Sequence, residues 1–135
     1  MNNKFMFEAL KQAKKAYNKE EVPVGVVIVK DNKIIAKAYN KIESKNDATK
    51  HAEIIAIQKA SKKIKNWRLY DCDMYVTLEP CAMCEAAIEL SRIKNVYYCL
   101  SKDKNITVNK TKYKKVKNYE NEYKNMLQSF FKKRR

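Results

Sequence analysis

Glycine is nearly absent from this sequence: Gly25 is the only one among 135 residues. The loops that bind phosphate in P-loop and dinucleotide-binding proteins need several glycines at fixed spacing, because the backbone must approach the phosphate closely. The sequence therefore excludes both of these classes. It also has no run of about 18 apolar residues, the length that indicates a membrane-spanning helix, so we expect no membrane partner.

A targeting signal is also missing from the amino-terminal residues. They lead directly into an amphipathic stretch, whereas a secretory signal peptide contains a continuous apolar segment. We therefore expect a cytoplasmic protein, in which cysteines stay free or bind metal and disulfides do not form.

Acidic residues are scarce relative to basic ones. Asp and Glu number 15 against 30 Lys and Arg, which gives a formal net charge of +15. A positive field of this size attracts polyanions and accelerates their encounter. Because most of the excess is lysine and asparagine is abundant too, a genome-wide compositional bias is the alternative explanation. The charge favours a nucleic-acid partner without identifying it.

The apolar residues, 45% of the chain, follow helical and strand periods in turn. Helical spacing predicts helices at 3–18, from Thr49 as N-cap to about Ala60, at 81–90 and at 119–131. Apolar and β-branched runs predict strands at 24–29, 34–39, 73–78 and 93–100, the first two forming a hairpin. Residues 40–49 and 101–118 show little periodicity, and we expect loops there.

This order of elements predicts an α/β fold. Strands that are connected through helices favour parallel pairing, whereas the hairpin is antiparallel, so the central sheet should be mixed. Helices on both faces would complete a three-layer α/β/α sandwich. With no internal repeat and no linker, residues 1–135 are expected to form a single domain.

Three side chains have the chemistry of zinc ligands: His51, Cys81 and Cys84. The other cysteines, Cys72 and Cys99, lie outside any ligand-like spacing with this pair. Structural zinc sites close with four protein ligands, whereas three ligands leave a position at which water is activated. The open, catalytic arrangement is favoured, and a structural or redox role for the Cys-x-x-Cys pair is the alternative.

Glu53 follows His51 by two residues, about 200° around a regular helix. Both can therefore face one metal ion only if the ion lies beyond the amino-terminal end of that helix. Cys81 follows Pro80 at the start of another predicted helix, where the helix dipole favours the thiolate. In this arrangement Glu53 would shuttle protons without binding the metal. Alternatively, it is an ordinary first-turn acid.

Two motifs carry a resemblance to a known family. His51-Ala52-Glu53 and Pro80-Cys81-Ala82-Met83-Cys84 match H-x-E…P-C-x-x-C, the signature of zinc-dependent deaminases. Further matching segments extend over nearly the whole chain, at 21–25, Asn40, 66–69, 77–81, 91–93 and 130–132. Together they resemble the tRNA adenosine deaminase (TadA-type) branch of the cytidine/deoxycytidylate deaminase superfamily.

The resemblance implies a cytidine-deaminase-like fold, a homodimer and one Zn²⁺ per chain. It implies hydrolysis of adenosine to inosine at the first anticodon position of a tRNA, bound through its anticodon stem-loop. Zinc-bound hydroxide would attack C6 while Glu53 shuttles protons. The remaining roles that it implies are zinc binding by His51, Cys81 and Cys84, and substrate binding by Asn40, Leu78, Asp103 and Lys104.

The sequence departs from the family pattern in two places. After the fourth strand the family has Gly-Ala, a charged residue, Asp, any residue and Lys, whereas residues 99–104 read Cys-Leu-Ser-Lys-Asp-Lys. Lys104 is therefore in register and Asp103 is displaced by one. Two residues beyond the second zinc-ligand cysteine, Ala86 replaces the usual glycine and follows Glu85.

Two other functions remain open. Deaminases of free guanine, cytosine or cytidine use the same zinc chemistry. A non-catalytic zinc module that binds RNA would need Cys72 or Cys99 as a fourth ligand. Residues 102–135 carry 12 basic and three acidic residues, a local net charge of +9, and this favours an RNA substrate over a small metabolite.

Overall fold

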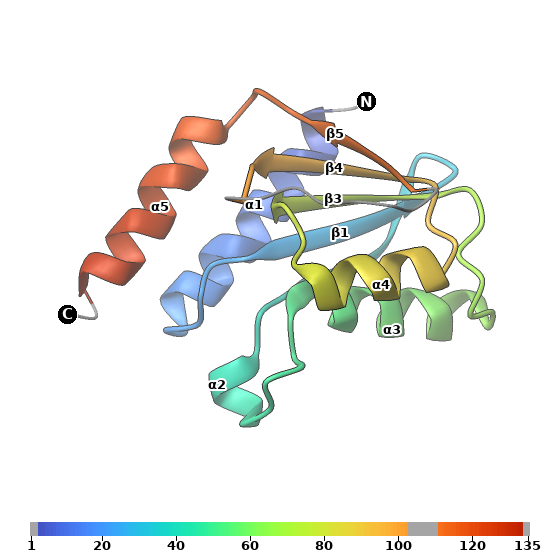
Figure 1. Ribbon diagram of the computed structural model, residues 1–135, viewed down its shortest axis with the longest axis horizontal. Helices are drawn as coiled ribbons and strands as arrows, with labels where there is room; N and C mark the ends of the chain where they lie inside the picture. The colour runs from blue at the N-terminus through green and yellow to red at the C-terminus, as the bar shows by residue number, and fades with distance from the viewer. Residues whose placement is uncertain (1–2, 103–110, 134–135) are drawn as a thin grey trace.

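The structure is a computed structural model that describes residues 3–102 and 111–133. These residues form both helices and strands, with the helices packed around a sheet (Figure 1). Their bounds are α1 Asn3–Asn18, β1 Gly25–Lys30, β2 Lys33–Tyr39, α2 Ile42–Lys45, α3 Ala52–Ile64, β3 Cys72–Leu78, α4 Ala82–Leu90, β4 Asn95–Leu100, β5 Lys112–Lys115 and α5 Glu120–Lys133.

The five strands form one sheet in the order β2-β1-β3-β4-β5. β1 pairs antiparallel with both β2 and β3, whereas β3, β4 and β5 run parallel to one another. Lys30 pairs with Lys33 across a two-residue turn in which Asp31 and Asn32 both have positive φ. Such turns match the twist of a hairpin, and Asp and Asn tolerate the left-handed conformation. The predicted mixed sheet and its hairpin are confirmed.

Alternate residues of β1 point into two separate cores. Val26 and Ile28 pack in a cluster with the buried side chains of α3, whereas Val27 and Val29 pack with Phe5 and other residues of α1. This alternation is the period of two that a strand imposes, and both faces of the central strands are covered by helix. The three-layer sandwich expected from the sequence is therefore confirmed.

The amino-terminal ends of α3 and α4 lie side by side below the sheet in Figure 1. Cys81 directly precedes α4, and it follows the carboxyl end of β3 by three residues. His51 directly precedes α3. Because ligands of open α/β sheets bind beyond the carboxyl ends of the strands, this edge is where a site is expected.

Thr49 is not the N-cap of α3, contrary to the sequence prediction: the cap residue is His51. The Thr49 hydroxyl instead donates to Asp47 Oδ1 at 2.7 Å, within the preceding loop. The first helical N–H, that of Ala52, is bound by Asn40 Oδ1 at 2.8 Å. The cap interaction thus comes from a residue distant in sequence, which a local pattern does not indicate.

Two short elements lie in segments that we predicted to be loops. α2 has four residues within 40–49, and β5 has four within 101–118. Neither is long enough for a periodic pattern to develop. In the part of the chain that the structure describes, no helix combines the length and apolarity needed to cross a membrane.

Candidate active site

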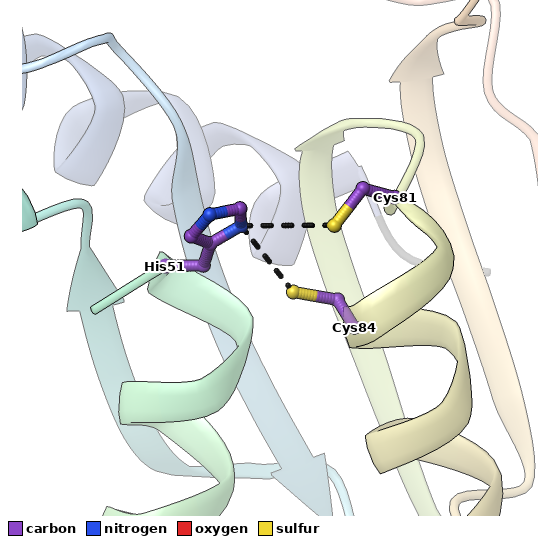
Figure 2. Close-up of side chains that lie close together, drawn as sticks. All are labelled: His51, Cys81 and Cys84. Carbon is purple, nitrogen blue, oxygen red and sulfur yellow. Dashed lines mark hydrogen bonds between the residues drawn. The ribbon is translucent and has the colours of Figure 1, made fainter. Parts of the chain in front are cut away.

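The three predicted zinc ligands converge between α3 and α4 (Figure 2). His51 Nδ1 lies 3.7 Å from Cys81 Sγ and 3.6 Å from Cys84 Sγ, and all three ligand atoms lie within 4.8 Å of one another. His51 and Cys81 are N-cap residues whose side chains make no capping hydrogen bond. Their side chains are therefore left to turn toward each other.

These distances fit a tetrahedral zinc site. Bonds of about 2.3 Å to sulfur and about 2.0–2.1 Å to nitrogen, meeting at a tetrahedral angle, place the two ligand atoms roughly 3.6 Å apart. The observed separations of 3.7 and 3.6 Å agree with this value. One imidazole and two thiols are also a donor set that Zn²⁺ prefers.

A fourth protein ligand is not found among residues 3–102 and 111–133, where the only candidate metal-binding group is His51, Cys81 and Cys84. Cys72 lies at the beginning of β3, whereas Cys81 follows the end of that strand. Cys99 packs in the α1 core, and its thiol donates to the Asn118 carbonyl at 3.7 Å. Burial raises the pKa of Cys99 to about 12. The closed structural site is therefore not formed by either cysteine.

Glu53, in the first turn of α3, is buried with 4% of its surface exposed. Its carboxylate accepts a hydrogen bond from the Cys84 thiol, so it faces the ligand cluster from the side of α3. Burial raises the pKa of Glu53 to about 7. Burial also raises the pKa of Cys84, with the nearby Glu53 adding to the effect. A cation bound among these groups would compensate the desolvation of both.

Asn40, predicted to bind substrate, is 5% exposed and lies beside the first turn of α3. The side-chain oxygen of Asn40 accepts a hydrogen bond from Ala52 N at 2.8 Å, and its main-chain N–H donates to the Val24 carbonyl at 3.2 Å. These bonds leave the amide NH₂ group to donate to a ligand. Leu78, the second predicted substrate-binding residue, is half-buried at the end of β3. Asp103 and Lys104 lie outside the described residues.

Glu21 has a role that the sequence did not indicate. Its carboxylate, 1% exposed, accepts from Glu43 N at 3.0 Å and from Ser44 N at 2.7 Å. It thereby anchors α2 and the loop that connects Asn40 to His51. Lys41 N donates to the Lys50 carbonyl at 3.0 Å and closes the base of the same loop. The only sequence signal was an acidic residue beside a proline motif, which does not reveal a main-chain partner 22 residues away.

The fold and the site define the class of protein: one with the cytidine-deaminase-like fold, in which a buried glutamate faces three candidate metal ligands. The model of the MafB19-like deaminases matches residues 1–135. The chain belongs to this deaminase family, among the tRNA-specific adenosine deaminases, and the resemblance inferred from its motifs is confirmed.

A tRNA-specific adenosine deaminase of Rickettsia bellii is 57% identical over 101 residues, which cover 73% of this chain and 70% of the relative. A structure from studies of A-to-I editing by tRNA:A34 deaminases at the wobble position superposes with a TM-score of 0.87 at 34% identity, covering 93% of this chain and 100% of that one. The guanine deaminase of Bacillus subtilis gives a TM-score of 0.71 at 41% identity, covering 75% and 66%.

The matched part of this chain spans 70%, 63% and 58% of the length of three bacterial tRNA-specific adenosine deaminases to which it is similar.

Proposed function

We propose that this chain hydrolyses adenosine to inosine at the first anticodon position of a tRNA. The observation that carries the proposal is the buried carboxyl of Glu53 beside the His51, Cys81 and Cys84 cluster. This arrangement suits deamination, which needs an activated water molecule and a group that relays its protons. The choice of substrate is supported by the relatives that are named as tRNA deaminases.

His51, Cys81 and Cys84 would hold one zinc ion per chain, because their separations and chemistry fit it. Zinc in a three-ligand site supplies a nucleophile from water at neutral pH. The helix ends contribute as well: α3 and α4 both direct their amino-terminal dipoles toward this point, which favours thiolate and other negative charge there.

Glu53 would move the protons. The reaction adds water across the C6–N1 bond of the purine and then breaks the C6–N6 bond, which releases ammonia. Glu53 takes a proton from the water and delivers it to N1, and a second transfer brings a proton to the departing amine. A carboxyl group that packing holds beside the cluster needs little rearrangement between these transfers.

Asn40 and Leu78 would position the base. The Asn40 amide NH₂ donates to the purine, and the Leu78 side chain forms an apolar wall at the end of β3. An anticodon loop presents its bases unpaired, so the cost of unstacking the target, normally a few kcal/mol, is reduced. The net charge of +15 supports contacts with the phosphates of the stem-loop. A cytoplasmic location would bring the protein to tRNA.

The test is to incubate the zinc-loaded protein with a tRNA that carries adenosine at the first anticodon position, and to measure inosine. Parallel reactions contain guanine, cytosine and cytidine, with ammonia release as the readout. Guanine is included because the Bacillus subtilis guanine deaminase is 41% identical in sequence. We expect inosine in the tRNA reaction. Turnover of a free base, with no inosine in the tRNA, would reject the proposal.

We further propose that two chains form a homodimer through the carboxyl ends of α3 and α4. Trp67, Tyr70 and Leu90 are each more than half exposed there. Arg92 contacts two of these residues: its guanidinium lies 5.6 Å from the centroid of the Trp67 ring and donates a hydrogen bond to the Leu90 carbonyl at 3.0 Å. Exposed apolar side chains that gather in this way are typical of protein interfaces.

Light scattering after gel filtration tests the dimer. We expect Leu90→Glu to halve the measured mass, because it places a charge in an apolar interface. Phe7→Glu is the matched control: Phe7 is also exposed, but it lies on α1, across the sheet from α4. A wild-type protein that is monomeric at micromolar concentration would contradict the proposal.

A further inference from the structure

Lys102 lies against the turn that carries Cys81, one of the proposed zinc ligands. This turn, residues 79–81, connects β3 to α4 and ends at Cys81. Lys102 follows β4, the strand next to β3. Its ammonium donates to the Pro80 carbonyl at 2.7 Å and pairs with the Glu85 carboxylate at 3.2 Å.

We propose that Lys102 is a positioning residue for the metal centre, which holds Cys81 in place through Pro80 and Glu85. The proposal rests on the zinc site described above and adds to it a residue that touches neither the metal ligands' sulfur atoms nor the substrate. Lys102 binds the main chain before Cys81, at the Pro80 carbonyl, and a side chain after it, the Glu85 carboxylate.

The contacts form a closed ring around Cys81. Glu85 N donates to the Cys81 carbonyl at 2.8 Å, as the first hydrogen bond of α4. The Glu85 side chain binds Lys102, and Lys102 binds the carbonyl of Pro80, the residue before Cys81. Cys81 itself makes no side-chain capping bond. Its sulfur position therefore depends on its main chain, and that main chain is fixed by this ring.

A second set of bonds joins the same two segments. Glu79 N donates to the Leu100 carbonyl at 2.9 Å, and Lys102 N donates to Glu79 Oε1 at 3.1 Å. Both carboxylates are nearly buried, with Glu79 3% and Glu85 7% exposed. The Lys102 main-chain N–H thus binds Glu79 while its ammonium pairs with Glu85, and removal of the ammonium would leave the buried Glu85 carboxylate without this counter-charge.

Lys102 and Glu85 lie in the two segments where this sequence departs from the family pattern. The Asp of the pattern is replaced by Lys102, and Glu85 precedes Ala86, which replaces the usual glycine. The structure pairs Lys102, which is one of these departures, with Glu85, the neighbour of the other.

The test compares zinc affinity in wild type, Lys102→Met and Lys102→Arg, by competition with a chromophoric chelator. Groups that orient metal ligands typically contribute 10–100-fold to metal affinity. We expect Lys102→Met to weaken zinc binding about 10-fold or more. Lys102→Arg should restore most of the affinity, since a guanidinium can contact both oxygens. The cobalt-substituted protein should show an altered thiolate-to-metal absorption band in Lys102→Met.

Lys37→Met is the matched control, because Lys37 forms an ion pair of similar length, 3.3 Å to Glu8, away from the zinc-ligand turn. Its zinc affinity should equal that of wild type. A Lys102→Met protein with unchanged zinc affinity and an unchanged cobalt spectrum would overturn the proposal. A purely structural ion pair would lower the melting temperature of the metal-free protein and leave both metal readouts unchanged.

Glu85→Ala decides the question if Lys102→Met does not fold. It removes one side of the ring and keeps a good helix former in α4. We expect weaker zinc binding here too, by a smaller factor, because Lys102 keeps its bond to Pro80. Unchanged affinity in Glu85→Ala would then reject the proposal. Failure of the proposed function is recognised separately, as a zinc-loaded wild-type protein that forms no inosine in the tRNA.

Discussion

Glu53 and Asn40 are buried polar side chains that adjoin the proposed zinc ligands on the side of α3. We expect Glu53→Gln to lower the rate of inosine formation about 10²–10⁴-fold, the usual contribution of a general acid–base group. Gln has the same shape but exchanges no proton, so the zinc content should remain at the wild-type value. Single-turnover kinetics on the tRNA substrate and metal analysis of the same sample measure both quantities.

Glu8→Gln provides the comparison for this variant, since Glu8 lies on α1 and pairs only with surface lysines. It should turn over at the wild-type rate. Loss of zinc in Glu53→Gln would show that Glu53 supports the metal centre rather than relaying protons.

Asn40 has two groups with separate roles, and two substitutions separate them. Asn40→Asp keeps the oxygen that binds Ala52 N but loses the NH₂ donor. Its free energy of unfolding should stay near wild type, whereas its KM for tRNA should rise about 10-fold, as one hydrogen bond of roughly 1.4 kcal/mol is lost. Asn40→Ala should show the same rise in KM and, in addition, a free energy of unfolding that is lower by about 1 kcal/mol, because the bond to Ala52 N is lost too.

Urea unfolding and steady-state kinetics on the two Asn40 variants give these numbers. Equal KM values for Asn40→Asp and wild type would mean that the amide only supports the amino-terminal end of α3.

The candidate metal ligands and the candidate proton relay could be predicted from the sequence because their residue types and spacing are those of a metal site. His51, Glu53, Cys81 and Cys84 lie close together only if two helix ends meet. The roles of Glu21 and Lys102 could not be predicted from the sequence. Their partners include main-chain atoms of Glu43, Ser44 and Pro80, which almost any residue would supply, and the Glu85 carboxylate that pairs with Lys102 is distant from it in sequence. Side chains that position other residues through the backbone leave no recognisable motif.

Among the elements, long helices and buried strands were predictable because their apolar residues repeat over several turns or pleats. α1 begins and ends where its helical period predicts, at Asn3 and Asn18. β5, with the sequence Lys-Tyr-Lys-Lys, was missed. It is an edge strand, and edge strands commonly carry lysine, which reduces their pairing with other chains. The same composition therefore resembles an exposed loop when only the sequence is considered.

Gly25 determines how closely α1 packs on β1, and Gly25→Ala tests this. A Cβ atom there would overlap the backbone atoms Ala9 O and Ala13 N, which belong to the regular helix and cannot move independently. We expect the free energy of unfolding to fall by about 3 kcal/mol or more, at the upper end of overpacking effects. Urea denaturation measures the change.

Lys37→Ala, on the exposed face of the neighbouring strand, is the comparison for Gly25→Ala and should change stability by less than about 0.5 kcal/mol. Equal stability of Gly25→Ala and wild type would show that α1 is free to shift away from the sheet.

At the scale of the whole molecule, the charge of +15 has two explanations: contacts with RNA phosphates and a general excess of lysine. Salt dependence distinguishes them. Each phosphate that the protein neutralises releases counterions, so about three contacts weaken binding roughly 30-fold between 50 and 200 mM salt. We expect the Kd for the anticodon stem-loop to rise by about this factor, and the rate at saturating RNA to stay unchanged, since Glu53 and Cys84 are buried away from the salt.

Fluorescence anisotropy with a labelled stem-loop measures the Kd at each salt concentration, and single-turnover rates are recorded on the same samples. A compositional excess of lysine spread over the surface would give a shallow slope for any polyanion, with no difference between the stem-loop and an unstructured RNA of equal length. A steep slope for the stem-loop alone requires phosphates held at fixed positions by this surface. That outcome would connect the charge of the molecule to the substrate that its buried site is proposed to accept.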